Sequence, residues 1–227
     1  NRYQELSGKM NMAFPEDSFE TYKRESFTAT QLEDYLSMLY ERLELLPYIK
    51  NEHQLKIDSY LHSGNWFMQM NLPNETIKSY KLFFKYYEDH KNNLDNSKSE
   101  DFLQLRSFAF AMTANNYEKL SHLDSAATVH KKNIEITQNA YIISYPSAIN
   151  NYGLYFYWTK KDLDSALIQF NKAFEITKKM FPDHHLLGSI RDNIADIYND
   201  QGFYKKAKPL YKANIEFYQQ SKDLNMH

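Results

Sequence analysis

The residues of this chain that could most readily hold a reactive group are Asp183, His184 and His185. A carboxylate and two adjacent imidazoles can share a metal ion when a further ligand arrives from elsewhere in the fold, and such a metal could support hydrolysis. Other catalytic signatures are missing: the sequence has no Cys, no Gly-x-Ser-x-Gly and no His-Glu-x-x-His, and its five Gly lie too far apart to cradle a phosphate. Apart from this one cluster, the sequence contains no motif typical of catalysis.

A second group of residues could bind a ligand. Tyr152, Tyr155, Phe156, Tyr157 and Trp158 form an aromatic cluster that could stack against bases. Nucleic-acid binding also needs a basic surface, and here 27 Lys and Arg are balanced by 29 Asp and Glu, for a net charge of −2. We therefore expect no direct nucleic-acid partner, and we interpret Phe156 and Tyr157 as core residues.

The composition favours helices. The 227 residues include 19 Tyr and 15 Phe but only 5 Gly and 6 Pro, so that few residues interrupt regular structure. No apolar run approaches the roughly 20 residues of a membrane-spanning helix, so we expect no membrane contact within this stretch. The absence of Cys excludes disulfides and thiolate ligands and is compatible with a reducing or an oxidising compartment.

An internal repeat indicates which elements position these residues. Small residues recur at four positions, which we call anchors, 50, 40 and 41 residues apart: Thr76, Ala126, Ala166 and Ala207. An aromatic residue lies nine positions before each anchor: Phe67, Tyr117, Tyr157 and Tyr198. The first spacing is longer because a polar stretch, 90–100, is inserted, and we interpret that stretch as a loop. Apolar residues recur three or four apart on both sides of a polar turn, which predicts a helical hairpin in each unit.

The repeat resembles the tetratricopeptide repeat, and the last unit is similar to the longer repeats of kinesin-light-chain type. The residues that carry this resemblance in the last unit are Pro182-Asp183-His184, Asp192-Asn193-Ile194-Ala195, Tyr198, Gly202-Phe203-Tyr204-Lys205-Lys206-Ala207 and Leu210-Tyr211. The third unit fits through Asn150-Asn151-Tyr152-Gly153 and Asp164-Ser165-Ala166-Leu167. The resemblance implies an all-α fold, a right-handed α–α superhelix of about four helical hairpins. It also implies that Asp183, His184 and His185 form the turn that opens a helix, so that no metal and no cofactor are expected.

We expect two parts in the chain. Residues 1–50 form an N-terminal helical cap or degenerate repeat, in which Thr30 and Glu33 make a capping box. Residues 51–227 form the repeat array, with units at about 51–91, 99–140, 145–180 and 184–221. Because the sequence begins without Met and ends without a clear cap, we expect it to be a piece of a longer protein.

In the resembling family the first helix of each hairpin lines the concave side of the superhelix, where a partner can touch several repeats. The candidate ligand-binding residues are those at the corresponding positions, counted back from the anchors: Asn65, Asn115, Glu118, Asn151, Tyr155, Trp158, Asp192, Asp196 and Asn199. Asn side chains both donate and accept hydrogen bonds with a peptide backbone, and Tyr and Trp supply apolar contact area. The carboxylates would favour a ligand with some positive charge.

We expect a non-catalytic module that binds a protein or peptide, without a cofactor. The Leu-Asp-Ser-Ala openings at Leu123 and Leu163 are similar to repeats of bacterial sensor proteins of the Bacteroidetes kind, which implies the sensory or interaction region of a larger signalling or transcription regulator. Such a region would be periplasmic or otherwise extracytoplasmic. One alternative is a cytoplasmic regulator of the peptide-pheromone receptor type, and another is a metal-dependent hydrolase that uses His184 and His185. The sequence does not predict the oligomeric state.

Overall fold

The computed structural model describes residues 53–94 and 99–224. The predicted N-terminal cap, residues 1–50 with its capping box, lies outside the described residues. The polar insert begins with a short 3-10 turn, Lys91–Asn93, and the next helix begins at Ser99, so that the end of the predicted loop at Glu100 is helical.

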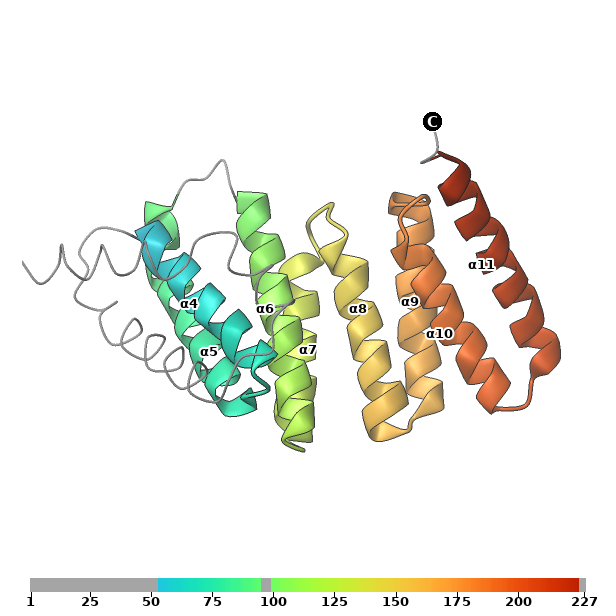
Figure 1. The fold of residues 1–227 in the computed structure, drawn as a ribbon, viewed down its shortest axis with the longest axis horizontal. Coiled ribbons are helices and arrows are strands. Elements are labelled where there is room, and N and C mark those ends of the chain that lie inside the picture. Colours follow the sequence, from blue (N-terminus) through green and yellow to red (C-terminus); the bar gives the residue numbers. More distant parts are fainter. Residues whose placement is uncertain (1–52, 95–98, 225–227) are drawn as a thin grey trace, which may run out of the picture.

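The described residues form eight α-helices and no strand, and consecutive helices pair into four hairpins (Figure 1). The pairs are α4 (His53–Gln69) with α5 (Pro73–His90), α6 (Ser99–Lys119) with α7 (Leu123–Thr137), α8 (Ser144–Leu154) with α9 (Leu163–Met180), and α10 (Leu186–Asp200) with α11 (Tyr204–Leu224). The predicted all-α fold of stacked helical hairpins is thereby confirmed.

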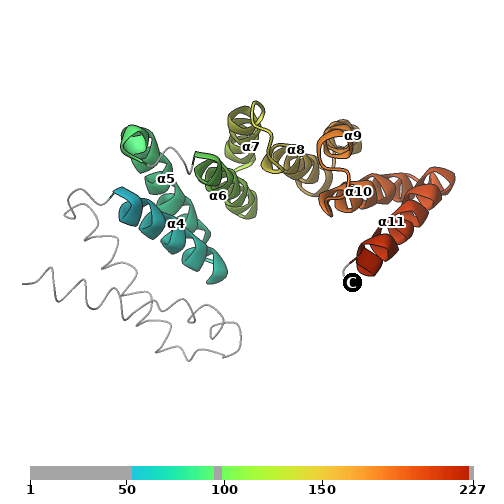
Figure 2. The same ribbon diagram turned by 90° about the horizontal axis from the view of Figure 1, so that it is seen from above.

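The hairpins follow one another along an arc when the molecule is seen from above (Figure 2). The first helices α4, α6, α8 and α10 lie along the inner side of this arc, and α5, α7 and α9 lie along the outer side. Each hairpin packs on the next through α5 with α6, α7 with α8, and α9 with α10. A row of residues on the four inner helices can therefore face one ligand.

The four hairpin turns share one backbone geometry. The residue five positions before each anchor has a positive φ, between 55° and 76°: Asn71, Ser121, Lys161 and Gly202. In three turns the N–H four positions before the anchor donates to the carbonyl of the aromatic residue nine before it, as from His122 to Tyr117 at 2.9 Å. Only Gly202 adopts this conformation without a steric cost, and the other three residues adopt it although each has a Cβ.

The helices of a hairpin approach closely where an inner glycine meets an outer aromatic ring. A Cβ placed on Gly153 would lie 2.6 Å from the ring of Phe170, and one placed on Gly64 would clash with the ring of Tyr80. Both rings are fully buried and follow their anchor by four residues. The anchors themselves are 0–2% exposed, which fits the packing role predicted for them.

Asparagine replaces the small residue of the family at two positions seven residues after the anchor. Asn133 and Asn214 are buried, and the amide of each donates to a carbonyl of its partner helix, that of Ser107 at 3.0 Å and that of Gly188 at 2.8 Å. Ala173 occupies the same position in the third hairpin and is fully buried. These two hairpins are thus joined by hydrogen bonds where small residues would otherwise allow close packing.

The third hairpin differs from the others in one respect. Its first helix, α8, continues as a π-helical segment, η4 (Tyr155–Lys160). Here the N–H of Asp162 donates to the carbonyl of Phe156, whereas the pattern of the other turns would place the acceptor one residue later, at Tyr157. A π-helical turn accommodates one extra residue. As a result, Gly153 lies 13 residues before its anchor, whereas its counterpart Gly64 lies 12 before.

Candidate peptide-binding surface

The nine predicted site residues all lie on the inner helices or on η4, but they differ in exposure. Asn115 and Asn199 are exposed, and Trp158 is 60% exposed. Tyr155 is only 3% exposed. The other five are half-buried: Asn65, Glu118, Asn151, Asp192 and Asp196.

Tyr155 does not lie open to a ligand as its sequence position predicted. Its ring packs against those of His130 and Tyr152, and its hydroxyl donates to the carbonyl of Leu123 at 3.1 Å. The reason is the extra residue in η4, which displaces each residue N-terminal to it by one position relative to the anchor Ala166. Tyr155 therefore corresponds to the buried residues one place further along in other hairpins, such as Asn116 and Ile197. Its structural role is in the core between the second and third hairpins.

Two of the polar site residues are held by tyrosines of the second helix of the same hairpin. Tyr80 donates to Asn65 at 2.5 Å, and Tyr211 donates to Asp196 at 2.6 Å. In both pairs the tyrosine lies four residues after the anchor of its hairpin, and the acceptor lies eleven residues before the same anchor. Burial, and then the hydrogen bond to Asp196, raise the pKa of Tyr211 to about 12. The side chains of Asn65 and Asp196 are thus fixed before any ligand arrives.

Glu118 joins the second and third hairpins. One of its carboxylate oxygens lies 3.0 Å from Nε2 of the buried His130, and the other accepts a hydrogen bond from the hydroxyl of Thr159 in η4. Its side chain is 18% exposed. The carboxylate thus positions η4 against the preceding hairpin, and little of it is open to a ligand.

The inner helix of the last hairpin has an acidic edge, which we define as Asp192, Asp196 and Asp200. These residues are spaced four apart on α10, so that they lie along one side of the helix. Their described partners are all uncharged: Asn214 for Asp192, Tyr211 for Asp196, and Tyr157, at 2.6 Å, for Asp200. None of the three forms a salt bridge with a described residue. Their negative charge therefore remains available to a cationic group.

Sequence reasoning missed two features of the inner helices. Phe108 on α6 is 42% exposed and lies seven residues, two helical turns, before Asn115. Helical spacing from Asn115 would have found it. Asn193 donates to Asn150 at 2.9 Å, which links α10 to α8 across the hairpin boundary. No sequence pattern marks this second contact.

Asp183, His184 and His185 lie in the turn before α10, as the resemblance implied. Nδ1 of His184 accepts a hydrogen bond from the N–H of Leu186, the first residue of α10, at 3.1 Å. Burial, and then the neighbouring His185, lower the pKa of His184. Within 53–94 and 99–224, no three His, Asp or Glu side chains are grouped so that they could hold a metal.

None of the described helices combines the length and the apolar character that crossing a bilayer requires.

These elements define a class of fold, a superhelix of tetratricopeptide-like helical hairpins. No family model matches the chain, and no curated protein matches its sequence. Solved structures do match it. The nearly identical TPR-like repeats of a Podospora anserina kinesin-light-chain protein superpose with a TM-score of 0.66 at 11% identity, covering 96% of this chain and 97% of that one.

Two Rap proteins are also similar. The apo form of RapI matches with a TM-score of 0.71 at 15% identity, over 95% of this chain and 72% of that one. A Rap protein complexed with Competence and Sporulation Factor matches with a TM-score of 0.62 at 16% identity, over 86% of this chain and 52% of that one. At these identities the likeness shows the fold, and it confirms the tetratricopeptide-like architecture predicted from the sequence.

Proposed function

We propose that this chain is a non-catalytic module that binds a peptide segment of another protein along its inner helices. The observation that carries the proposal is the acidic edge of α10, three carboxylates on one side of this helix that form no salt bridge with a described residue. Protein surfaces that keep unpaired charge of one sign select ligands of the opposite sign. The ligand is therefore a peptide with at least one Lys or Arg facing α10.

The remainder of the inner row supplies less specific contacts. Asn115 and Asn199 offer side-chain amides that can pair with any peptide backbone. Trp158 and Phe108 offer exposed aromatic area, and aromatic residues of this kind dominate binding energy where a partner buries them. The peptide accordingly carries an apolar side chain N-terminal or C-terminal to its basic residue. The similar Rap protein solved with Competence and Sporulation Factor supports this use of the fold.

A library of labelled twelve-residue peptides, each with one fixed Lys and one fixed Leu, tests the proposal by fluorescence anisotropy. The variant with Asp192→Asn, Asp196→Asn and Asp200→Asn removes the charge of the acidic edge but keeps its hydrogen-bond acceptors. We expect it to weaken the best Lys-containing peptide about tenfold, since each exposed charge pair contributes modestly.

The matched control replaces three exposed aspartates of the outer helices by asparagine: Asp89→Asn, Asp124→Asn and Asp164→Asn. Both variants change the net charge from −2 to +1, so that a general effect of charge would affect them equally. Equal loss in the two variants, or no library member bound by the parent protein, would contradict the proposal.

We further propose that the module is the sensory or interaction region of a larger bacterial regulator. The sequence that flanks this stretch in the full-length protein tests this. A hydrophobic helix followed by a kinase or DNA-binding region supports a sensor, whereas an upstream helix-turn-helix or three-helix bundle supports a receptor of the pheromone-binding type. Flanking sequence with neither would contradict the regulatory role and leave the peptide-binding proposal to its own test.

A further inference from the structure

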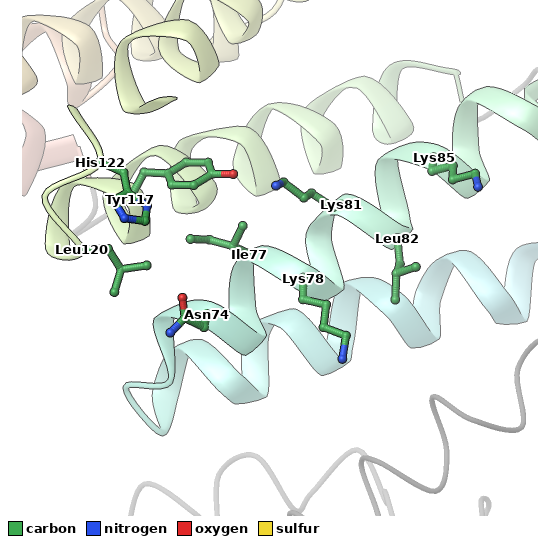
Figure 3. Close-up of a pocket in the computed structure, with 9 residues that line it drawn as sticks. All are labelled: Asn74, Ile77, Lys78, Lys81, Leu82, Lys85, Tyr117, Leu120 and His122. Carbon is green, nitrogen blue, oxygen red and sulfur yellow. The ribbon is translucent and has the colours of Figure 1, made fainter. Parts of the chain in front are cut away.

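A pocket lies beside α5, the outer helix of the first hairpin, where this helix meets the end of α6 and the turn into α7 (Figure 3). Its volume is about 630 Å³. The residues that line it come from α5 and from the 117–122 segment of the second hairpin. The pocket is therefore distinct from the inner-helix surface described above.

Three lysines of α5 give this pocket its charge. Lys78, Lys81 and Lys85 are spaced three and four residues apart, so that they lie along one side of the helix, and all three are exposed. No carboxylate is among the residues that line the pocket, and none of the three lysines forms a salt bridge with a described residue. Nζ of Lys81 lies 5.5 Å from the ring centre of Tyr117, which it faces in Figure 3.

Apolar side chains lie between these charges. Ile77 and Leu82 come from α5, and Leu120 comes from the turn that follows α6 (Figure 3). Leu120 lies on the side of Ile77, and Leu82 lies further along α5. Leu82 is 36% exposed, and Ile77 is almost fully buried beneath the pocket. A ligand that fills the pocket can thus bury an aliphatic side chain while its charged groups remain at the rim.

We propose that this pocket binds an acidic peptide segment of a partner protein, whose carboxylates pair with Lys78, Lys81 and Lys85 while one aliphatic side chain contacts Ile77 and Leu120. The helical rise separates Lys78 from Lys85 by about 10 Å along α5, which is the length of about three residues of extended peptide. A single phosphate or carboxylate ion is too small to contact all three lysines. The aliphatic side chains of the pocket make no favourable contact with a highly charged polymer such as nucleic acid, and a protein with a net charge of −2 does not attract a polyanion.

Binding of a labelled twelve-residue peptide with three Glu and two Leu tests this inference by fluorescence anisotropy at low and at physiological salt. Its counterparts with Gln or with Lys in place of Glu serve as ligand controls. We expect the Glu peptide to bind with an affinity that falls as salt rises, and the Gln peptide to bind about tenfold more weakly. The Lys peptide should bind only at the acidic edge of α10, so that it should not compete with the Glu peptide.

The test variant is Lys78→Gln, Lys81→Gln and Lys85→Gln, and the matched control is Lys131→Gln, Lys172→Gln and Lys179→Gln on α7 and α9. All six lysines are exposed, and both variants take the net charge from −2 to −5. The test variant should lose about tenfold in affinity for the Glu peptide, and the control should stay within about twofold of the parent. Thermal unfolding followed by circular dichroism establishes that both variants are folded.

Three results would overturn the inference. The two lysine variants could lose affinity equally, which would indicate a general effect of charge. The Gln peptide could bind as well as the Glu peptide, which would indicate apolar binding alone. Vesicles containing one third phosphatidylserine could bind the parent but not the α5 variant while the Glu peptide fails to bind, which would identify a membrane surface instead. The variant with asparagine at Asp192, Asp196 and Asp200 should bind the Glu peptide as tightly as the parent protein does. The two binding proposals are therefore tested independently.

Discussion

Two aromatic residues of η4, three positions apart, have opposite environments. Tyr155 is 3% exposed and is held by a hydrogen bond to the second hairpin, whereas Trp158 is 60% exposed. The Trp158 ring nevertheless has two neighbours: its centre lies 4.5 Å from that of the Tyr157 ring and 5.3 Å from Nζ of Lys161. A large side chain that is already restrained loses little conformational entropy when a ligand covers it, which suits Trp158 to the role of an anchor.

Alanine substitutions should separate these two roles. Trp158→Ala should weaken the best Lys-containing peptide by about tenfold or more with little change in stability, because most of its ring faces solvent. Tyr155→Ala should destabilise the fold by roughly 3 kcal/mol, since it removes a packed ring from the core. Urea unfolding and peptide anisotropy on both variants measure the two effects. The assignment is wrong if Trp158→Ala unfolds the protein as readily as Tyr155→Ala does.

The tyrosines make stability depend on high pH. Burial raises the pKa of Tyr80, Tyr157 and Tyr211, the last to about 12 from an ordinary value of 10.0. The folded protein therefore holds these phenolic protons more tightly than the unfolded chain. The contribution of Tyr211 is complete below pH 10 and is lost as the pH rises through 12, and those of Tyr80 and Tyr157 are fully lost only at still higher pH.

We expect the melting temperature to fall steeply between pH 10 and pH 12, and Tyr211→Phe to make that fall smaller, because this variant has no proton to lose at that position. Tyr204→Phe is the control, since Tyr204 is 67% exposed. Circular dichroism melts at pH 8 and pH 11 provide the measurement. An unaltered pH dependence in Tyr211→Phe would mean that the Tyr211 and Asp196 pair is not formed in solution.

At the scale of the element, each hairpin turn depends on one residue in the left-handed region. Gly202 adopts this conformation freely, whereas Ser121, with φ of 59°, has a Cβ that makes it unfavourable. Because both residues are exposed, little packing is lost when either is changed.

Ser121→Gly should therefore stabilise the protein by up to about 1 kcal/mol, the relief of the left-handed strain less the entropy that glycine adds to the unfolded chain. Gly202→Ala should destabilise it by about 1 kcal/mol, even though no atom lies within 4 Å of the added Cβ. Denaturant midpoints for the two variants give the measurement. Changes of the same sign in both would contradict a conformational origin.

Across the array, the closely packed pairs of described helices belong either to one hairpin or to two adjacent hairpins. Stability in such an array is a sum of hairpin and nearest-neighbour contributions, so that a local change affects a limited part of the chain. Asn214 is suited to test this, because its side chain joins α11 to α10 through Gly188, Asp192 and Arg191.

Asn214→Ala should cost about 1–3 kcal/mol, since it leaves buried polar groups of α10 without a partner. Amide hydrogen exchange should accelerate in α10 and α11 and to a smaller extent in α9, while α4 and α5 keep their exchange rates. Exchange that accelerates equally in all four hairpins would show instead that the array unfolds as one cooperative unit.

The helical hairpins, their order and their buried anchors could be predicted from the sequence, because an α-helix has a fixed period and the anchors repeat at nearly constant spacing. The sequence placed Ala126, Ala166 and Ala207 in the core correctly for this reason. The same constant period made it misplace Tyr155, since the extra residue of the π-helical segment leaves no pattern that spacing could reveal.

The hydrogen-bond partners of the polar site residues depend on how the helices pack and could not be predicted from the sequence. Asn65 and Asp196 are held by tyrosines of the paired helix, and Glu118 is held by the neighbouring hairpin. The lysine pocket of α5 likewise exists only because the turn of the second hairpin packs beside it. Helical periodicity specifies the face on which a residue lies, but the contacts between helices depend on packing in three dimensions, which a local pattern does not contain.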